Sequence, residues 1–81
     1  MARDDSHLDP TDRLHAVIVR ALAGVGIDCE ALPERALATV ERFTRFDWEI
    51  AEALAGVHES SARGAVVERF AFDCHQRERA A

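Results

Sequence analysis

The chain has 81 residues, of which 48% are hydrophobic and 31% are charged, and it contains only two prolines and four glycines. This composition excludes an intrinsically disordered chain and predicts one small globular domain. The formal net charge of −5 opposes non-specific binding to nucleic acid or to an anionic membrane, because neutralising phosphate groups requires a basic surface.

The start of the chain shows no pattern of a targeting segment. Met1 leads into charged residues, and no stretch approaches the roughly 18 apolar residues of a membrane span. We therefore expect a soluble, cytoplasmic protein. Residues 1–8 are polar and are expected to form a flexible N-terminal tail.

The first predicted helix covers about residues 10–24. Asp9 can cap its free amides, and Pro10 suits the first helical position. Apolar residues then recur at steps of three and four, as in an amphipathic helix: Leu14, Val17, Ile18, Ala21, Leu22 and Val25. Gly24 and Gly26 indicate its end.

The second predicted helix runs from about residue 33 to residue 55, beginning at Pro33 and ending before Gly56. Its apolar side chains cover an arc of roughly 200°, about twice what packing on one side requires. Two interpretations remain open. Either this helix is the centre of a bundle and contacts both neighbours, or Phe46 or Trp48 contacts a second chain.

Asp47 falls inside this apolar arc, where an ionised carboxylate would cost several kcal/mol unless it were paired. Arg63, Arg77 and His15 are the candidate partners. We expect Asp47 and Arg63 to be buried polar residues that form a structural ion pair. The alternatives are a functional acid whose pKa is raised by burial, or an Asp47 side chain that reaches solvent.

The third predicted helix covers about residues 60–77. Ser60 or Ser61 can cap its start, which explains these serines better than nucleophilic catalysis does. One face carries the residues of a buried stripe: Val66, Val67, Phe70, Ala71 and Cys74. Residues 9–77 thus form a single predicted helical domain, followed by a frayed C-terminus at residues 78–81.

Phe72 does not belong to that stripe. At about 100° per residue it lies roughly 160–200° from Phe70 and Cys74, on the side of the helix that carries charged residues. A large aromatic side chain at such a position is expected to contact a partner; the alternative is an ordinary exposed surface residue, which many proteins tolerate.

The sequence contains no recognisable cofactor, metal or catalytic motif. Cys29 and Cys74 have neither a CxxC nor a zinc-finger spacing, and we expect both to be reduced thiols. The histidines form no HxxxH or HExxH pair: His7, His15, His58 and His75. A cluster of His15, Asp47 and Cys74 is the nearest approach to a metal site, and adjacent helical residues such as Cys74 and His75 point about 100° apart. No metal, cofactor or catalytic residue is predicted.

These observations predict an all-α protein, a three-helix bundle or helical array that forms a dimer. The expected function is that of a small acidic protein-interaction module, such as a subunit, adaptor or inhibitor. It would act without catalysis by docking through Phe46, Trp48 and Phe72 onto another protein or onto a second copy of itself. Nucleic acid, membranes and small molecules are not predicted partners.

Three alternatives stay open. In the first, the second and third helices form a helix-turn-helix unit whose last helix reads DNA through Arg69, His75 and Arg79. In the second, the acidic surface mimics nucleic-acid phosphates, as in phage-encoded inhibitors. The third is an enzyme or a metalloprotein.

Overall fold

The computed structural model describes residues 9–58 and 61–80, with side chains described as far as Gln76. It contains four helices, α1 (Pro10–Gly24), α2 (Pro33–Glu41), α3 (Arg45–Ala55) and α4 (Ser61–Ala80), and the described residues include no strand. The prediction of an all-α chain is confirmed. The predicted tail at residues 1–8 and the Ser60 cap lie outside the described residues.

α1 has the bounds that its terminal residues predict. Asp9 is extended, and its carboxylate accepts a hydrogen bond from the Asp12 amide at 2.9 Å, which satisfies one of the free donors at the start of the helix. At the other end Gly26 has a φ of 87°, and the Ile27 amide donates to the Leu22 carbonyl at 2.9 Å. This glycine turns the chain away and ends α1.

The prediction of a single helix over residues 33–55 is wrong, because one helix ends at Glu41 and a new one begins at Arg45. Thr44 is extended there, and its hydroxyl accepts a hydrogen bond from the Asp47 amide at 3.2 Å. The Asp47 carboxylate in turn accepts one from the Thr44 amide at 2.8 Å. This reciprocal capping box begins a new helix, so that the predicted three helices become four.

The later boundaries follow from local geometry. α3 ends at Gly56, whose φ of 68° is left-handed, and the Val57 amide donates back to the Glu52 carbonyl at 2.9 Å. α4 continues to Ala80 rather than ending near residue 77.

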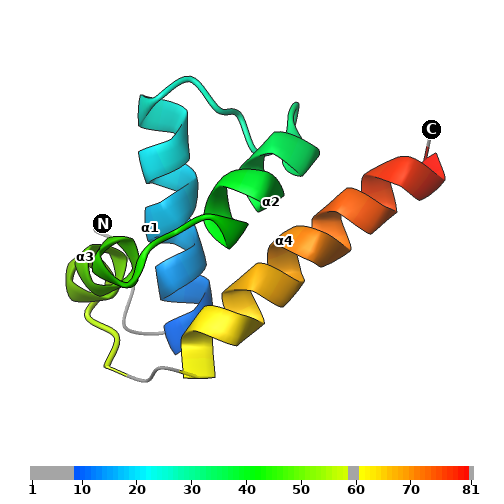
Figure 1. Ribbon diagram of the computed structural model, residues 1–81. Coiled ribbons are helices and arrows are strands. Elements are labelled where there is room, and N and C mark those ends of the chain that lie inside the picture. Colours follow the sequence, from blue (N-terminus) through cyan, green and yellow to red (C-terminus); the bar gives the residue numbers. More distant parts are fainter. Residues whose placement is uncertain (1–8, 59–60, 81) are drawn as a thin grey trace, which may run out of the picture.

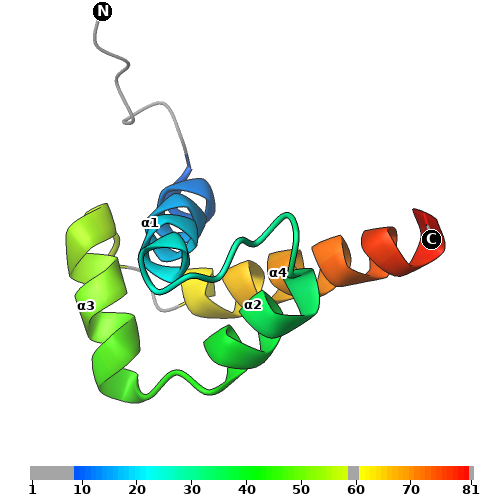
Figure 2. The ribbon, with the colours of Figure 1, turned by 90° about the horizontal axis from the view of Figure 1, so that it is seen from above.

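α1 lies between α3 and α4 and packs against both, while α2 packs mainly on α4 (Figures 1 and 2). Figure 2 shows α3 at one side of the molecule and the C-terminal half of α4 at the other. The core is formed by the inward stripes of the helices and by two loop residues: Leu14, Ile18, Leu22, Ile27, Ala36, Val40, Ala51, Val57, Ala62, Val66, Phe70 and Cys74. The predicted stripe of the last helix is buried at Val66, Phe70 and Cys74, and partly buried at Val67 and Ala71.

Candidate docking surface

α3 has two apolar faces on opposite sides. The inner face consists of Trp48, Ala51 and Ala55, which pack against the core. The outer face of α3 consists of Phe46, Ile50, Ala53 and Leu54, which lie within an arc of about 100° with no charged residue among them. Phe46 is 67% exposed, Ile50 45% and Leu54 72%. A helix with an inner and an outer apolar face has more apolar surface than one chain covers.

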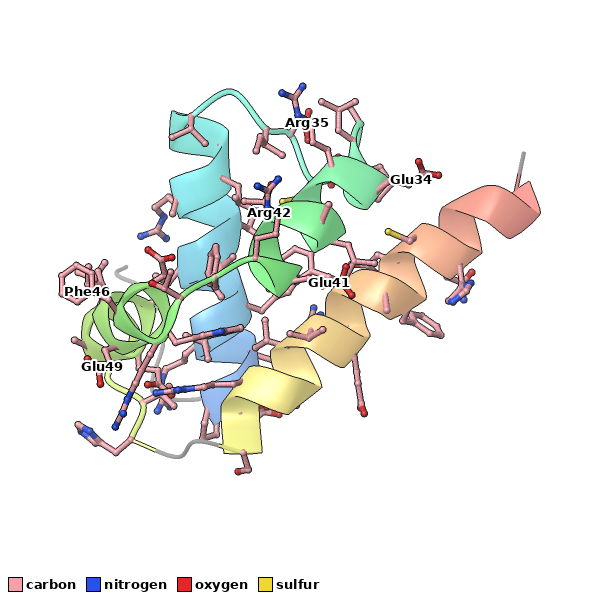
Figure 3. The ribbon with its side chains drawn as sticks, viewed as in Figure 1. Glu34, Arg35, Glu41, Arg42, Phe46 and Glu49 are labelled. Atoms are coloured by element: carbon pink, nitrogen blue, oxygen red, sulfur yellow. The ribbon has the colours of Figure 1, made fainter. Side chains whose placement is uncertain are left out.

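Phe46 takes the outward position proposed for it from the sequence. Figure 3 shows its ring projecting from α3 on the side away from α1, together with Glu49. Trp48 differs from that expectation, because it lies on the inner face in edge-to-face contact with Phe43, with ring centroids 5.2 Å apart. The two aromatic residues therefore point in different directions, and Trp48 packs within its own chain.

Phe72 is 59% exposed on α4, as its position in the helical projection indicates. It is not near Phe46, since the part of α4 beyond its middle lies away from α3 in both ribbon views (Figures 1 and 2). The three aromatic residues predicted as one interface do not form a continuous surface. The outer face of α3 contains three large exposed apolar side chains, Phe46, Ile50 and Leu54, which is more than surround Phe72 on α4.

A hollow borders the outer face where α3 crosses α1. It has a volume of about 340 Å³ and is lined by Val17, Arg20, Ala21 and Leu54. Leu54 thus belongs both to the outer face and to the wall of the hollow. The apolar surface continues from α3 onto α1 at this point.

Charged residues flank the outer face. On one side Arg45 and Glu49 form an exposed ion pair at 3.5 Å. On the other side lies Asp47, which is exposed and caps α3. The predicted burial of Asp47 is therefore wrong: the break before α3 places this residue in a first turn, where its carboxylate binds a backbone amide at the surface.

The buried acid is Glu52, which the sequence analysis missed. It is 9% exposed, and its carboxylate accepts two hydrogen bonds from Arg63, at 2.9 Å from Nε and 2.6 Å from Nη2. Arg63 is half-buried, so its predicted role in a structural ion pair holds with a different acid. These hydrogen bonds hold the pKa of Glu52 below its ordinary value, against the opposing effect of burial. Glu52 follows Trp48 by four residues, which is the spacing that places both on one side of a helix.

His15 lies on the opposite side of α1 from α3. Its ring packs on Phe70 with centroids 4.8 Å apart, and within the described residues its buried Nε2 has no hydrogen-bond partner. Burial, with a smaller contribution from Arg69, lowers the pKa of His15. It lines an open hollow of about 620 Å³ together with residues of α1, the linker, α2 and α4: Val19, Cys29, Glu30, Pro33, Asp73 and Gln76.

No group of three His, Cys, Asp or Glu side chains among the described residues is arranged to hold a metal ion. Cys29 and Cys74 are not joined by a disulfide bond, and burial together with Asp28 and Asp73 raises the pKa of Cys29. A raised pKa leaves less of the nucleophilic thiolate at neutral pH. No helix among the described residues is both long enough and apolar enough to cross a bilayer.

Comparisons with protein family models, with curated proteins and with solved structures find no match. The function of this chain is therefore inferred from the geometry of its surface.

Proposed function

We propose that the protein is a small protein-interaction module that acts by docking through the outer face of α3, without catalysis. The observation that supports this proposal is the second apolar face of α3, which contains three large exposed side chains, Phe46, Ile50 and Leu54. Burying a side chain of this kind fully contributes about 1.5–3 kcal/mol, so covering the exposed parts of these three contributes about 3 to 5 kcal/mol.

The shape of this surface suits a helix as the docking element. Phe46, Ile50 and Ala53 follow at steps of four and three along one helix, which is the spacing that a second helix packs against. Charged residues flank the outer face on both sides and are suited to setting the orientation of a partner.

The DNA-binding alternative has less support. Of the arginines proposed to read DNA, Arg69 forms an ion pair with the Asp12 carboxylate of α1. Phe72, which is exposed near the middle of α4, would lie on the DNA-reading face without contributing a hydrogen bond. The mimicry of nucleic-acid charge is also weakly supported, because Arg45 and Arg63 pair with the acids Glu49 and Glu52.

A site-specific cross-linking experiment in cells of the source organism tests the proposal. A photo-reactive phenylalanine analogue replaces Phe46 in one strain and Arg35 in another, since Arg35 is exposed on α2 and points away from α3 (Figure 3). We expect discrete covalent adducts from position 46 and none from position 35. Equal adducts from both positions, or none from position 46, would contradict docking through this face.

A further inference from the structure

We infer that the occupant of the outer face of α3 is a second copy of this chain, whose own α3 packs antiparallel to the first about a two-fold axis through Ile50. This inference rests on the proposed docking function of that face and names its partner. Its basis is that the outer face is complementary to itself in shape and, beside the hollow, in charge.

The complementarity of shape follows from the order of residues along α3. Ile50 lies in the middle of the outer face, with the large Phe46 four residues before it and the small Ala53 three residues after it. A two-fold rotation reverses the direction of the helix, so Phe46 of each copy lies over Ala53 of the other. Large side chains then pack against small ones at both ends, and the two Ile50 side chains meet at the axis.

The complementarity of charge lies beside the hollow. A two-fold axis perpendicular to the pair of helices keeps each flank of one copy next to the same flank of the other. Asp47 and the hollow lie on the same flank of α3, so Asp47 of one copy is brought opposite Leu54 and Arg20 of the other. Arg20 is exposed and has no ion-pair partner among the described residues. Two such pairs of opposite charge form in each dimer.

The acidic charges on the other flank of α3 oppose dimerisation. There Glu49 of one copy approaches Glu49 of the other near the axis, although each forms an ion pair with its own Arg45 at 3.5 Å. Neutralising Glu49 is therefore expected to tighten the dimer, whereas reversing the charge of Arg20 is expected to weaken it. These opposite effects are specific to the antiparallel arrangement.

The area involved indicates a reversible dimer. The exposed parts of Phe46, Ile50 and Leu54 amount to roughly 350 Å² per chain, taking on the order of 200 Å² for the full surface of such a side chain. Two copies give about 700 Å², and the walls of the hollow enlarge this area, which places the contact among small interfaces that associate weakly and transiently. We therefore expect a dissociation constant in the micromolar range.

Sedimentation of the full chain from about 5 to about 500 µM tests this inference. The mass is expected to rise from that of the 9.0 kDa monomer toward twice that value. Phe46→Glu is expected to remain monomeric throughout. Phe72→Glu is the matched control, because it places the same charge at an exposed phenylalanine outside the outer face, and it is expected to dimerise like the natural chain. Unchanged helical circular dichroism shows that each variant is folded.

Two further variants test the arrangement. Arg20→Glu places two acids opposite each other and is expected to raise the dissociation constant about tenfold, whereas Glu49→Gln is expected to lower it about twofold. Dimerisation that is unaffected by Arg20→Glu would overturn the antiparallel arrangement.

The possible failures are distinguishable. A natural chain that stays monomeric at every concentration overturns self-docking, while cross-links from position 46 to a different protein would still support the docking function. A dimer that persists in Phe46→Glu but is lost in Phe72→Glu also overturns self-docking through α3, because it forms through α4, while adducts from position 46 still decide the docking function.

Discussion

The ionised carboxylate of Glu52 stabilises the fold through its hydrogen bonds with Arg63. Arg63 holds its pKa below the ordinary value of 4.5, so the folded chain releases this proton more readily than the unfolded chain does. The pair therefore stabilises the protein above about pH 4.5, and this contribution is lost as the pH falls through the folded-state pKa.

We expect Glu52→Gln to be less stable than the natural chain at pH 7 and to approach it in acid, as measured by urea unfolding between about pH 3 and pH 7. Glu49→Gln, which changes an exposed pair, provides the control and is expected to have a smaller effect. A difference between Glu52→Gln and the natural chain that does not vary with pH would contradict the assigned role.

The lowered pKa of His15 makes stability fall as the pH falls, in the same direction as for Glu52 but beginning at a higher pH. Burial against Phe70 and the positive charge of Arg69 disfavour the imidazolium in the folded chain, and the carboxylates of Asp73 and Asp12 only partly offset this. As the pH falls below the ordinary value of 6.5, the unfolded chain binds the proton first, so stability decreases until the folded-state pKa is reached.

His15→Leu is accordingly expected to remove the part of the pH dependence that lies just below about pH 6.5. Unfolding in urea at about pH 7.5 and about pH 5.5 measures this effect, with His58→Gln in the exposed loop as the control. Nuclear magnetic resonance titration of His15 measures the pKa directly, and a value at or above 6.5 would show that the desolvation argument is wrong.

At the scale of elements, the capping box of Thr44 and Asp47 divides the chain into α2 and α3. Thr44→Ala removes the hydroxyl that accepts the Asp47 amide, and we expect it to lower the free energy of unfolding by about 1 to 2 kcal/mol. Thr39→Ala is the matched control, because its hydroxyl donates at 2.8 Å to the Arg35 carbonyl within α2 and caps nothing. Equal losses in chemical denaturation would contradict a specific capping role for Thr44.

Two glycines are expected to respond to alanine with opposite signs. Gly56 ends α3 at a φ of 68°, where a Cβ is strained, so Gly56→Ala is expected to destabilise the protein by about 1 to 2 kcal/mol. Gly64 lies inside α4 with open space at its Cβ position, so Gly64→Ala is expected to stabilise the protein by about 0.5 to 1 kcal/mol. Thermal unfolding of both variants tests this, and a shift of the same sign in both would contradict it.

The elements that end in strong local signals could be predicted from the sequence. Asp9, Pro10 and Gly26 define α1 because each acts on the adjacent backbone. The break before α3 could not be predicted from periodicity, because the apolar pattern continues through it in phase. The signal that could have shown it was Thr44 followed by Asp47, a box closed by the shorter aspartate in place of the more usual glutamate or glutamine.

The missed break explains the errors at the candidate site. In one long helix Asp47 falls among apolar residues, whereas in the first turn of a new helix it faces solvent and binds the Thr44 amide. Phe46 and Phe72 could be placed at the surface from helical projection alone. The inward position of Trp48 and the pairing of Glu52 depend on how α3 packs against the rest of the molecule, and periodicity contains no information on that.

At the scale of the whole molecule, the hollow beside Leu54 exists only because α3 crosses α1. Its walls come from residues more than thirty positions apart in the chain, and no local pattern joins them. The core is small for the same reason that the outer face is large: α3 is a short helix that divides its apolar residues between two sides. Because the core of this 81-residue chain is small, a partner that covers the exposed apolar surface contributes a large share of the stability of the folded state.

This gain should be visible in the stability of the whole chain. A partner that binds only folded chains stabilises them by mass action, so for a self-associating protein the thermal midpoint rises with concentration. Because one kcal/mol corresponds to several degrees in a domain of this size, we expect a rise of a few degrees between about 5 and about 500 µM. Calorimetry of the natural chain, Phe46→Glu and Phe72→Glu measures it. Phe46→Glu should have a midpoint independent of concentration and equal to that of the dilute natural chain, since Phe46 contributes to the surface between copies and little to the core beneath α3.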